Sequence, residues 1–195
     1  MRLNSFASTA AIVAAVAGIA AFSGAASAAS NVGATSASAD LDFRVTIPSV
    51  VFLQVGAGSF KQNDTDVDEI AFAPTPAEFT ALNPVAGTGG NLGSGKVTVR
   101  VFGNTGPLAL SSTATTLTSG GDTIPWSEIT VAANGGVPHP AFTDTGVMST
   151  PLTTNGNGNS RVTNLQGDWT YTYDNSAEVA EGVYLGTVTY TVATP

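Results

Sequence analysis

The sequence predicts an all-β protein: a single antiparallel β-sandwich preceded by an extended N-terminal tail. Short runs with apolar residues at every second position recur along the chain, which is the pattern of half-buried strands. Gly, Asn and Pro clusters separate these runs, and Thr and β-branched residues fill them. After residue 28 no apolar stripe repeats at helical spacing. This pattern favours an immunoglobulin-like Greek-key sandwich over a barrel or a jelly roll.

The first 28 residues have the organisation of a secretory signal peptide. Arg2 supplies the positive charge, residues 10–22 form an apolar stretch, and Ala26-Ser27-Ala28 offers small residues to signal peptidase. The apolar stretch is short for a membrane anchor and consists mainly of Ala and Gly. We therefore expect cleavage before Ala29 and a secreted bacterial product without a membrane span.

Two different segments follow the predicted cleavage site. Residues 29–40 are small or turn-prone apart from Val32, so we expect an extended tail. Residues 41–47 then alternate strictly, with Leu41, Phe43, Val45 and Ile47 on one side of the chain. This alternation predicts the first strand of a sandwich domain that covers residues 41–195, and Pro48 ends that strand.

Further strands are predicted from the same alternation and from runs of β-branched and aromatic residues. They cover residues 49–55, 69–72, 96–102, 107–117, 126–132, 149–154, 160–165, 168–173 and 182–193. The Gly-rich residues 87–95 lack the Lys-Ser/Thr ending of a phosphate-binding loop and are interpreted as a turn. Residues 176–181 could form a single helical turn.

The composition argues against two functional classes. Fourteen acidic against six basic residues give a formal charge of −8, which opposes binding to the phosphates of nucleic acids. The chain has no Cys and one His, so thiol nucleophiles and disulfides are excluded and little remains for His-based catalysis. We therefore expect a protein that is not an enzyme.

An acidic stretch is the most concentrated polar feature. Asp64, Asp66 and Asp68 stand at every second position and Glu69 follows, which resembles the opening of a calcium-binding loop. The alternative is a solvated acidic loop, and calcium is the one cofactor that the sequence suggests. Asn63 begins an Asn-x-Thr sequon and is the candidate glycosylation site.

Three aromatic residues lie at alternate positions near the C-terminus: Trp169, Tyr171 and Tyr173. Such a row forms either the core-facing side of a strand or a platform on which sugar rings stack. The first interpretation is the more common one for a strand of this kind.

The whole mature chain resembles bacterial pilin-like or fimbrial subunits. The likeness lies in the small-residue tail that leads into residues 41–47, in the closing strand 186–192, and in the weakly charged, Cys-free, Thr-rich texture. The closing strand is similar to those of spore-coat-U-like secreted pilus proteins and chaperone–usher pilins. The resemblance implies a structural subunit of an extracellular adhesive filament at the cell surface. It further implies self-polymerisation, a periplasmic chaperone and an outer-membrane assembly platform.

In such proteins each subunit is an incomplete sandwich, and an N-terminal segment of the next subunit completes it by donor-strand complementation. Carried over, the resemblance places the donor in residues 31–42 or, because the tail residues are small, in residues 41–47. The donor candidates are Val32, Ala34, Ala37, Ala39, Leu41 and Phe43, and the acceptor candidates are Val188, Tyr190 and Val192. If both segments belong to the subunit's own sheet, the protein is instead a self-complete secreted module that binds calcium or carbohydrate.

Overall fold

The computed structural model describes residues 30–155 and 161–195, so the predicted signal peptide lies outside the described part. The chain divides into two units, Met1–Ile47 and Pro48–Pro195. Residues 41–47 form no strand, and the strand prediction for them is wrong. A strand needs a hydrogen-bonded neighbour, and no strand in the described part of the chain pairs with this segment. We refer to the second unit, from Pro48 onward, as the compact unit.

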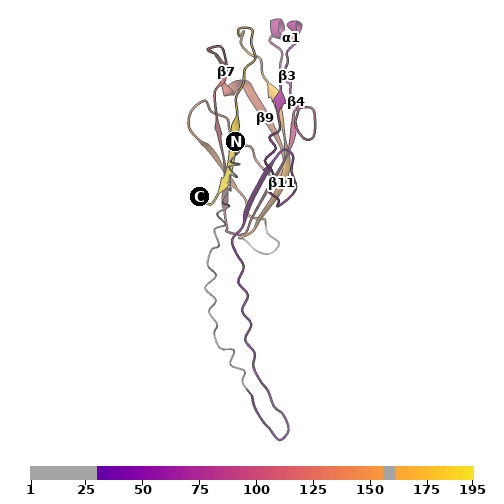
Figure 1. Cartoon of the computed structure of the whole chain (residues 1–195), viewed down its shortest axis with the longest axis vertical. Coiled ribbons are helices and arrows are strands. Elements are labelled where there is room, and N and C mark those ends of the chain that lie inside the picture. The colour runs from indigo at the N-terminus through magenta and orange to yellow at the C-terminus, as the bar shows by residue number, and fades with distance from the viewer. Residues whose placement is uncertain (1–29, 156–160) are drawn as a thin grey trace, which may run out of the picture. The chain divides into compact units, whose positions relative to one another are not determined.

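The larger sheet is antiparallel throughout (Figure 1). Its order is β1 (Val51–Val55), β5 (Lys96–Gly103), β11 (Thr163–Tyr173) and β9 (Ile129–Gly135). The short β3 (Val85–Ala86) pairs with the end of β11. β1 and β9 are thus edge strands of this sheet, and β3 forms a further short edge beside β11.

The smaller sheet is also antiparallel, with β6 (Leu108–Ala114) between β10 (Met148–Leu152) and β12 (Val188–Ala193). β12 is shorter than the predicted strand 182–193. Before Val188 the chain stays attached to its neighbour through hydrogen bonds between Thr187 and Thr115 and through a bridge between Leu185 and Thr118.

Short elements complete the described part of the chain. β2 (Ile70–Ala71) pairs with β4 (Thr88–Gly89), and β7 (Leu117–Ser119) pairs with β8 (Asp122–Ile124). A 3-10 turn spans Trp126–Glu128.

One short helix, α1 (Pro76–Ala81), was not predicted. Thr75 and Glu78 form a reciprocal capping box at its start, and Pro76 has the φ angle that a first helical position needs. The helical turn suggested at residues 176–181 is absent, and that segment is irregular.

The sequence predicts two strands, at residues 160–165 and 168–173. In the structure a single strand, β11, runs from Thr163 through both regions. Gly167 lies between the two predicted strands, and in the structure it continues the strand. A Cβ atom at Gly167 would lie 2.4 Å from the carbonyl oxygen of Asn134, so glycine lets β9 approach β11 closely.

The core lies between the inward faces of the two sheets. Along β5 buried and half-buried side chains alternate strictly, with Val97, Val99 and Val101 inside. From the other sheet Leu108 and Leu110 meet them, and neither is exposed. The predicted all-β, antiparallel, sandwich-like fold is thereby confirmed, whereas the immunoglobulin-like Greek-key connectivity stays a prediction.

Candidate functional site

The inward face of β12 is incompletely covered. Val188, Tyr190 and Val192 point toward the core at alternate positions, yet all three are only half-buried. On the neighbouring β6, to which β12 is paired, Leu108 and Leu110 have no exposed surface. The core-facing residues of β12 are therefore less completely covered than those of β6.

β1 shows the same incomplete cover from the other sheet. Val51, Leu53 and Val55 face inward because they pair with the inward-facing positions of β5. Val51 is 42% exposed, and Leu53 and Val55 are half-buried, whereas Val99 and Val101 beside them are fully buried. We call these half-buried or exposed inward residues of β1 and β12 the open edge.

The opposite side of the sandwich is closed. The segment that joins β9 to β10 passes over the core there, and Val137 within it is fully buried. Trp169 Nε1 donates to the carbonyl oxygen of Val137 at 3.0 Å, and Ser112 Oγ donates to that of Ala141 at 3.2 Å. The two sides of the core thus differ, and only the β1–β12 side lacks such a cover among the described residues.

β12 also offers free backbone groups. The amide of Thr115 on the neighbouring segment donates to the carbonyl of Thr187, so Thr187 and every second residue after it face β6. The alternation of an antiparallel ladder then turns the N–H and C=O groups of Val188, Tyr190 and Val192 away from β6. No described strand pairs with that side of β12. An extended segment can therefore add to this edge.

β1 and β12 lie next to each other across the open edge but do not hydrogen-bond as a ladder. Cα atoms of the two strands approach within 8 Å, and in Figure 1 they are the indigo and yellow strands. A strand placed between two others separates them by about 10 Å. Occupation of the open edge by a strand must therefore move β1 and β12 slightly apart.

A partly buried polar chain anchors the middle of β12. His139 Nε2 lies 2.8 Å from the hydroxyl of Tyr190, which lies 3.1 Å from the hydroxyl of Tyr171 on β11. Burial lowers the pKa of His139 to about 4 and raises the pKa of Tyr171 to about 12. Burial also raises the pKa of Tyr190, so all three groups are neutral at pH 7. Sequence reasoning missed this network because its members are far apart in the chain.

The aromatic row of β11 belongs to the core. Trp169 is fully buried, and Tyr171 and Tyr173 are 7% and 6% exposed. The core interpretation of these residues is confirmed, and they do not form a surface on which sugar rings stack.

The predicted acceptor residues lie on one strand face, whereas the predicted donor residues lie in the exposed N-terminal segment. Taken by itself, that segment has two parts. Val32, Ala34, Ala37 and Ala39 are exposed small or isolated side chains. From residue 41 onward large apolar side chains follow, namely Leu41, Phe43, Val45 and Ile47, with 62%, 86%, 83% and 76% of their surface exposed.

Exposure of large apolar side chains to water is unfavourable in free energy, and here such side chains recur at alternate positions. Apart from Val32, the donor candidates before residue 40 are alanines, whose side chains are too small to fill a deep pocket. The large alternating apolar side chains that a donor strand needs thus lie in residues 41–47, where Val45 and Ile47 accompany the predicted Leu41 and Phe43. The donor role of either segment stays a prediction.

The backbone just after this segment is held in place by Asn104. Asn104 Nδ2 donates to the carbonyl of Pro48 at 2.8 Å, and its Oδ1 accepts the amide of Val50 at 2.8 Å. The amide of Asn104 in turn donates to the carbonyl of Val50 at 3.2 Å. The chain direction at the start of the compact unit is thus fixed.

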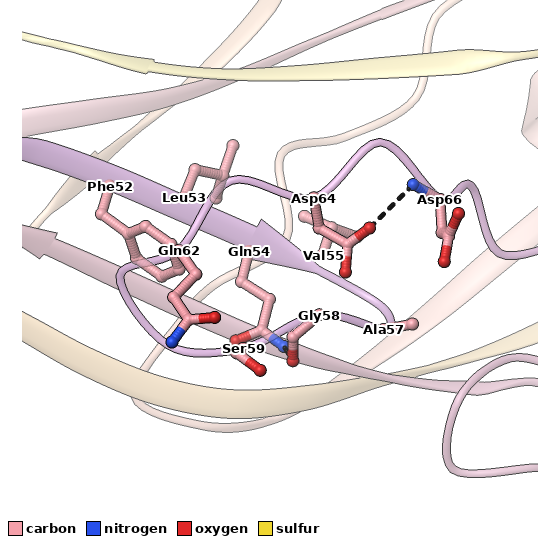
Figure 2. Close-up of a pocket in the computed structure, with 10 residues that line it drawn as sticks. All are labelled: Phe52, Leu53, Gln54, Val55, Ala57, Gly58, Ser59, Gln62, Asp64 and Asp66. Carbon is pink, nitrogen blue, oxygen red and sulfur yellow. Dashed lines mark hydrogen bonds between the residues drawn. The ribbon is translucent and has the colours of Figure 1, made fainter.

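A small hollow lies beside β1, where the following loop folds back around the strand (Figure 2). Gln54 is buried there, and its Nε2 donates to the carbonyls of Gly56 at 3.1 Å and Gly58 at 2.9 Å. Asn63, the candidate glycosylation site, is exposed on this loop. The hollow thus lies where hydrogen bonds from Gln54 hold the loop against β1.

The four residues of the calcium hypothesis are not brought together. Asp64 Oδ1 accepts the amide of Asp66 at 3.0 Å, as Figure 2 shows. Asp68 accepts the amide of Ala57 through its own carboxylate, and the Glu69 side chain is exposed. Within residues 30–155 and 161–195 no three acidic or His side chains are grouped closely enough to hold a metal ion.

No family model matches the chain, and comparison with curated proteins and with solved structures finds no match. Among the described residues no helix has the length and apolar character needed to cross a membrane. The functional argument therefore depends on the geometry of the open edge and of the N-terminal segment.

Proposed function

We propose that this protein is the structural subunit of an extracellular filament and that residues 41–47 of one copy occupy the open edge of the next. The observation that carries the proposal is a match between two incomplete features. One is a core left open between β1 and β12, and the other is a seven-residue segment with four exposed apolar side chains at alternate positions. A strand added to β12 would gain main-chain hydrogen bonds and bury those side chains.

The dimensions support this pairing. At about 3.3 Å per residue, residues 41–47 extend over roughly 20 Å and β12 over roughly 17 Å. Inward positions on β12 recur at every second residue, as do the apolar residues of the donor. Asp42, Arg44 and Thr46 would then face solvent, which suits their polarity.

The direction of the donor follows from where the chain enters the compact unit. β1 begins and β12 ends near Asn104, so we call this the Asn104 end, and the other end, where β12 begins, the Leu185 end. A donor antiparallel to β12 places its Ile47 at the Leu185 end. Its own compact unit then follows beyond that end, which gives a head-to-tail contact that repeats into a filament.

The same constraint disfavours insertion of the segment into its own unit in that direction. Pro48 is fastened at the Asn104 end, and neighbouring Cα atoms are about 3.8 Å apart. Ile47 of the same copy cannot reach the Leu185 end, which lies roughly 17 Å away along β12. A second copy meets no such constraint.

An open edge of this kind needs protection before assembly, because free strand edges pair unspecifically. This supports the predicted periplasmic chaperone and outer-membrane assembly platform as partners. The alternative is a self-complete module that binds calcium or carbohydrate. It has less support, because the aromatic row of β11 lies in the core and the described residues contain no group of acidic ligands.

The proposal is tested with a full-length mature chain whose own donor is silenced by Phe43→Ser and Val45→Ser. A peptide that corresponds to residues 38–48 is added, and its binding is measured by calorimetry. We expect stoichiometric binding of this peptide, and filaments in electron micrographs of the unsubstituted chain but not of the silenced chain. The matched control carries Arg44→Ser and Thr46→Ser on the opposite side of the donor and should still form filaments.

Two results would contradict the proposal. One is monomers in every sample together with no peptide binding. The other is filaments whose formation is indifferent to the substitution of Phe43 and Val45.

A further inference from the structure

An exposed apolar pair lies at the Leu185 end, just beyond the start of β12. Val183 and Leu185 are 75% and 69% exposed. Their backbone is nevertheless firmly held, because Leu185 exchanges two hydrogen bonds with Thr118 at 3.1 and 3.2 Å. At Gly182 a Cβ atom would lie 2.2 Å from Ser119 Oγ, so this segment sits tightly on β7. The two side chains are thus presented to solvent on a fixed backbone.

Charge is distributed unevenly between the two ends of the compact unit. Asp122, Glu178 and Glu181 are exposed beside the apolar pair at the Leu185 end. Arg161 is exposed at the Asn104 end, where its carbonyl accepts the amide of Gly106 at 3.0 Å. Three carboxylates thus lie at the Leu185 end, and a guanidinium lies at the Asn104 end, which would favour contact between opposite ends of two copies.

We propose that Val183 and Leu185, with the acidic side chains around them, form a seat for the Asn104 end of the next copy. This inference rests on the proposed function, because the donor direction argued above brings Pro48 of the incoming copy to the Leu185 end. No residue separates Ile47 of the donor from Pro48, which Asn104 fastens. The incoming unit must consequently lie directly against this end of the receiving unit.

The occupant is thus a second copy of this chain. Its Val50, which is 42% exposed at the Asn104 end, supplies apolar surface, and Arg161 supplies the complementary charge. The seat adds a contact to the donor strand and limits bending between neighbouring units.

The test compares two double variants of the full mature chain. Val183→Ser with Leu185→Ser removes the apolar pair, and Val147→Ser with Met148→Ser removes a matched exposed pair at the start of β10, the far edge of the same sheet. We expect the first variant to raise the protein concentration needed for filament formation roughly tenfold or more, because the seat then loses its apolar contact. The second variant should assemble as the unsubstituted chain does.

Peptide binding separates this inference from the proposed function. The peptide of residues 38–48 ends at Pro48, so it lacks the compact unit that carries the Asn104 end. It should bind the Val183→Ser, Leu185→Ser variant, made with a silenced donor, as tightly as it binds the silenced chain alone. Failure of the peptide to bind either chain, together with monomers in every sample, would overturn the proposed function, and with it the seat.

A charge variant provides an independent measurement. Arg161→Glu should also weaken assembly, and the loss should shrink as salt is added because screening removes like-charge repulsion. Unchanged assembly of both the apolar variant and the Arg161→Glu variant, with normal peptide binding, would overturn the seat and leave the donor strand intact.

Discussion

At the scale of single residues, His139 stands out because it is an ionisable group inside an aromatic cluster. Its ring contacts Phe142 and Trp169, with centroids 4.6 Å away in both cases, and it faces the hydroxyl of Tyr190. The groups that face it are neutral at pH 7, since burial raises the pKa of both Tyr171 and Tyr190. Nothing in this cluster compensates a positive charge on the imidazole.

The stability of the domain should therefore depend on the protonation of His139. Burial lowers its pKa from 6.5 to about 4, so between these values the unfolded chain binds more protons than the folded one. The free energy of unfolding should fall as the pH drops from 6.5 toward 4, by about 2 kcal/mol at pH 5 from this residue. In urea denaturation at pH 7 and pH 5, the free energy of unfolding should fall less between the two pH values for His139→Gln than for the unsubstituted chain. An equal fall for both chains would show that His139 does not contribute.

Asn104 carries a second prediction at this scale. Asn104→Ala removes two hydrogen bonds to the backbone of Pro48 and Val50, which should lower the free energy of unfolding by about 1–2 kcal/mol. The loss should be visible in urea denaturation of a chain with a silenced donor, so that assembly does not mask it. Asn91→Ala provides a matched control, because Asn91 also makes two side-chain hydrogen bonds, both to Thr98. Its substitution should leave the exchange protection of the Val50 amide unchanged, whereas Asn104→Ala should reduce it.

At the scale of elements, β12 allows its two hydrogen-bonding edges to be tested separately. Val192→Pro removes an amide that faces the open edge, and proline is tolerated on that side of an edge strand. Thr191→Pro removes an amide that faces β6, so it should disrupt the ladder and destabilise the domain. We expect Val192→Pro to leave a folded chain that binds the peptide of residues 38–48 at least about tenfold more weakly. Tight binding by the Val192→Pro chain would mean that the donor does not pair with β12.

The elements also show how far sequence patterns reach. Alternation correctly predicted β5, β6 and the inward face of β12, because period-two burial needs only that one face be covered. The same alternation at residues 41–47 predicted a strand that the described chain does not form. A periodic pattern reports that one side of a segment is suited to burial, but not which neighbour buries it.

Parts of the candidate site could not be predicted for a related reason. Val188, Tyr190 and Val192 were identified from their own strand, whereas Leu53 and Val55 became part of the site only through the placement of β1 beside β12. The link from His139 to Tyr190 spans 51 residues and leaves no local signal in the sequence. Helix α1 was not predicted, although Thr75 and Glu78 form a recognisable capping box.

At the scale of the whole molecule, the sandwich is closed on one side and open on the other. Val137 covers the β9–β10 side, whereas the inward residues of β1 and β12 are left half-buried or exposed and no further strand of the compact unit lies beside them. Apolar surface that stays exposed contributes nothing to folding, so the isolated unit forgoes part of the stability that its core could provide. A donor segment would supply the missing cover from outside the unit.

Donor binding should therefore raise the stability of the entire domain and not merely that of its edge. A ligand that binds only the folded state adds about 2.7 kcal/mol to the free energy of unfolding at a hundredfold excess over its Kd. We expect the melting temperature of the donor-silenced chain to rise steadily with the concentration of the 38–48 peptide. A peptide with serine in place of Phe43 and Val45 should leave it unchanged. Hydrogen exchange should slow in β1 and β12 and in β6 as well, since the core is shared, and protection confined to the N-terminal segment would contradict a donor that completes the sandwich.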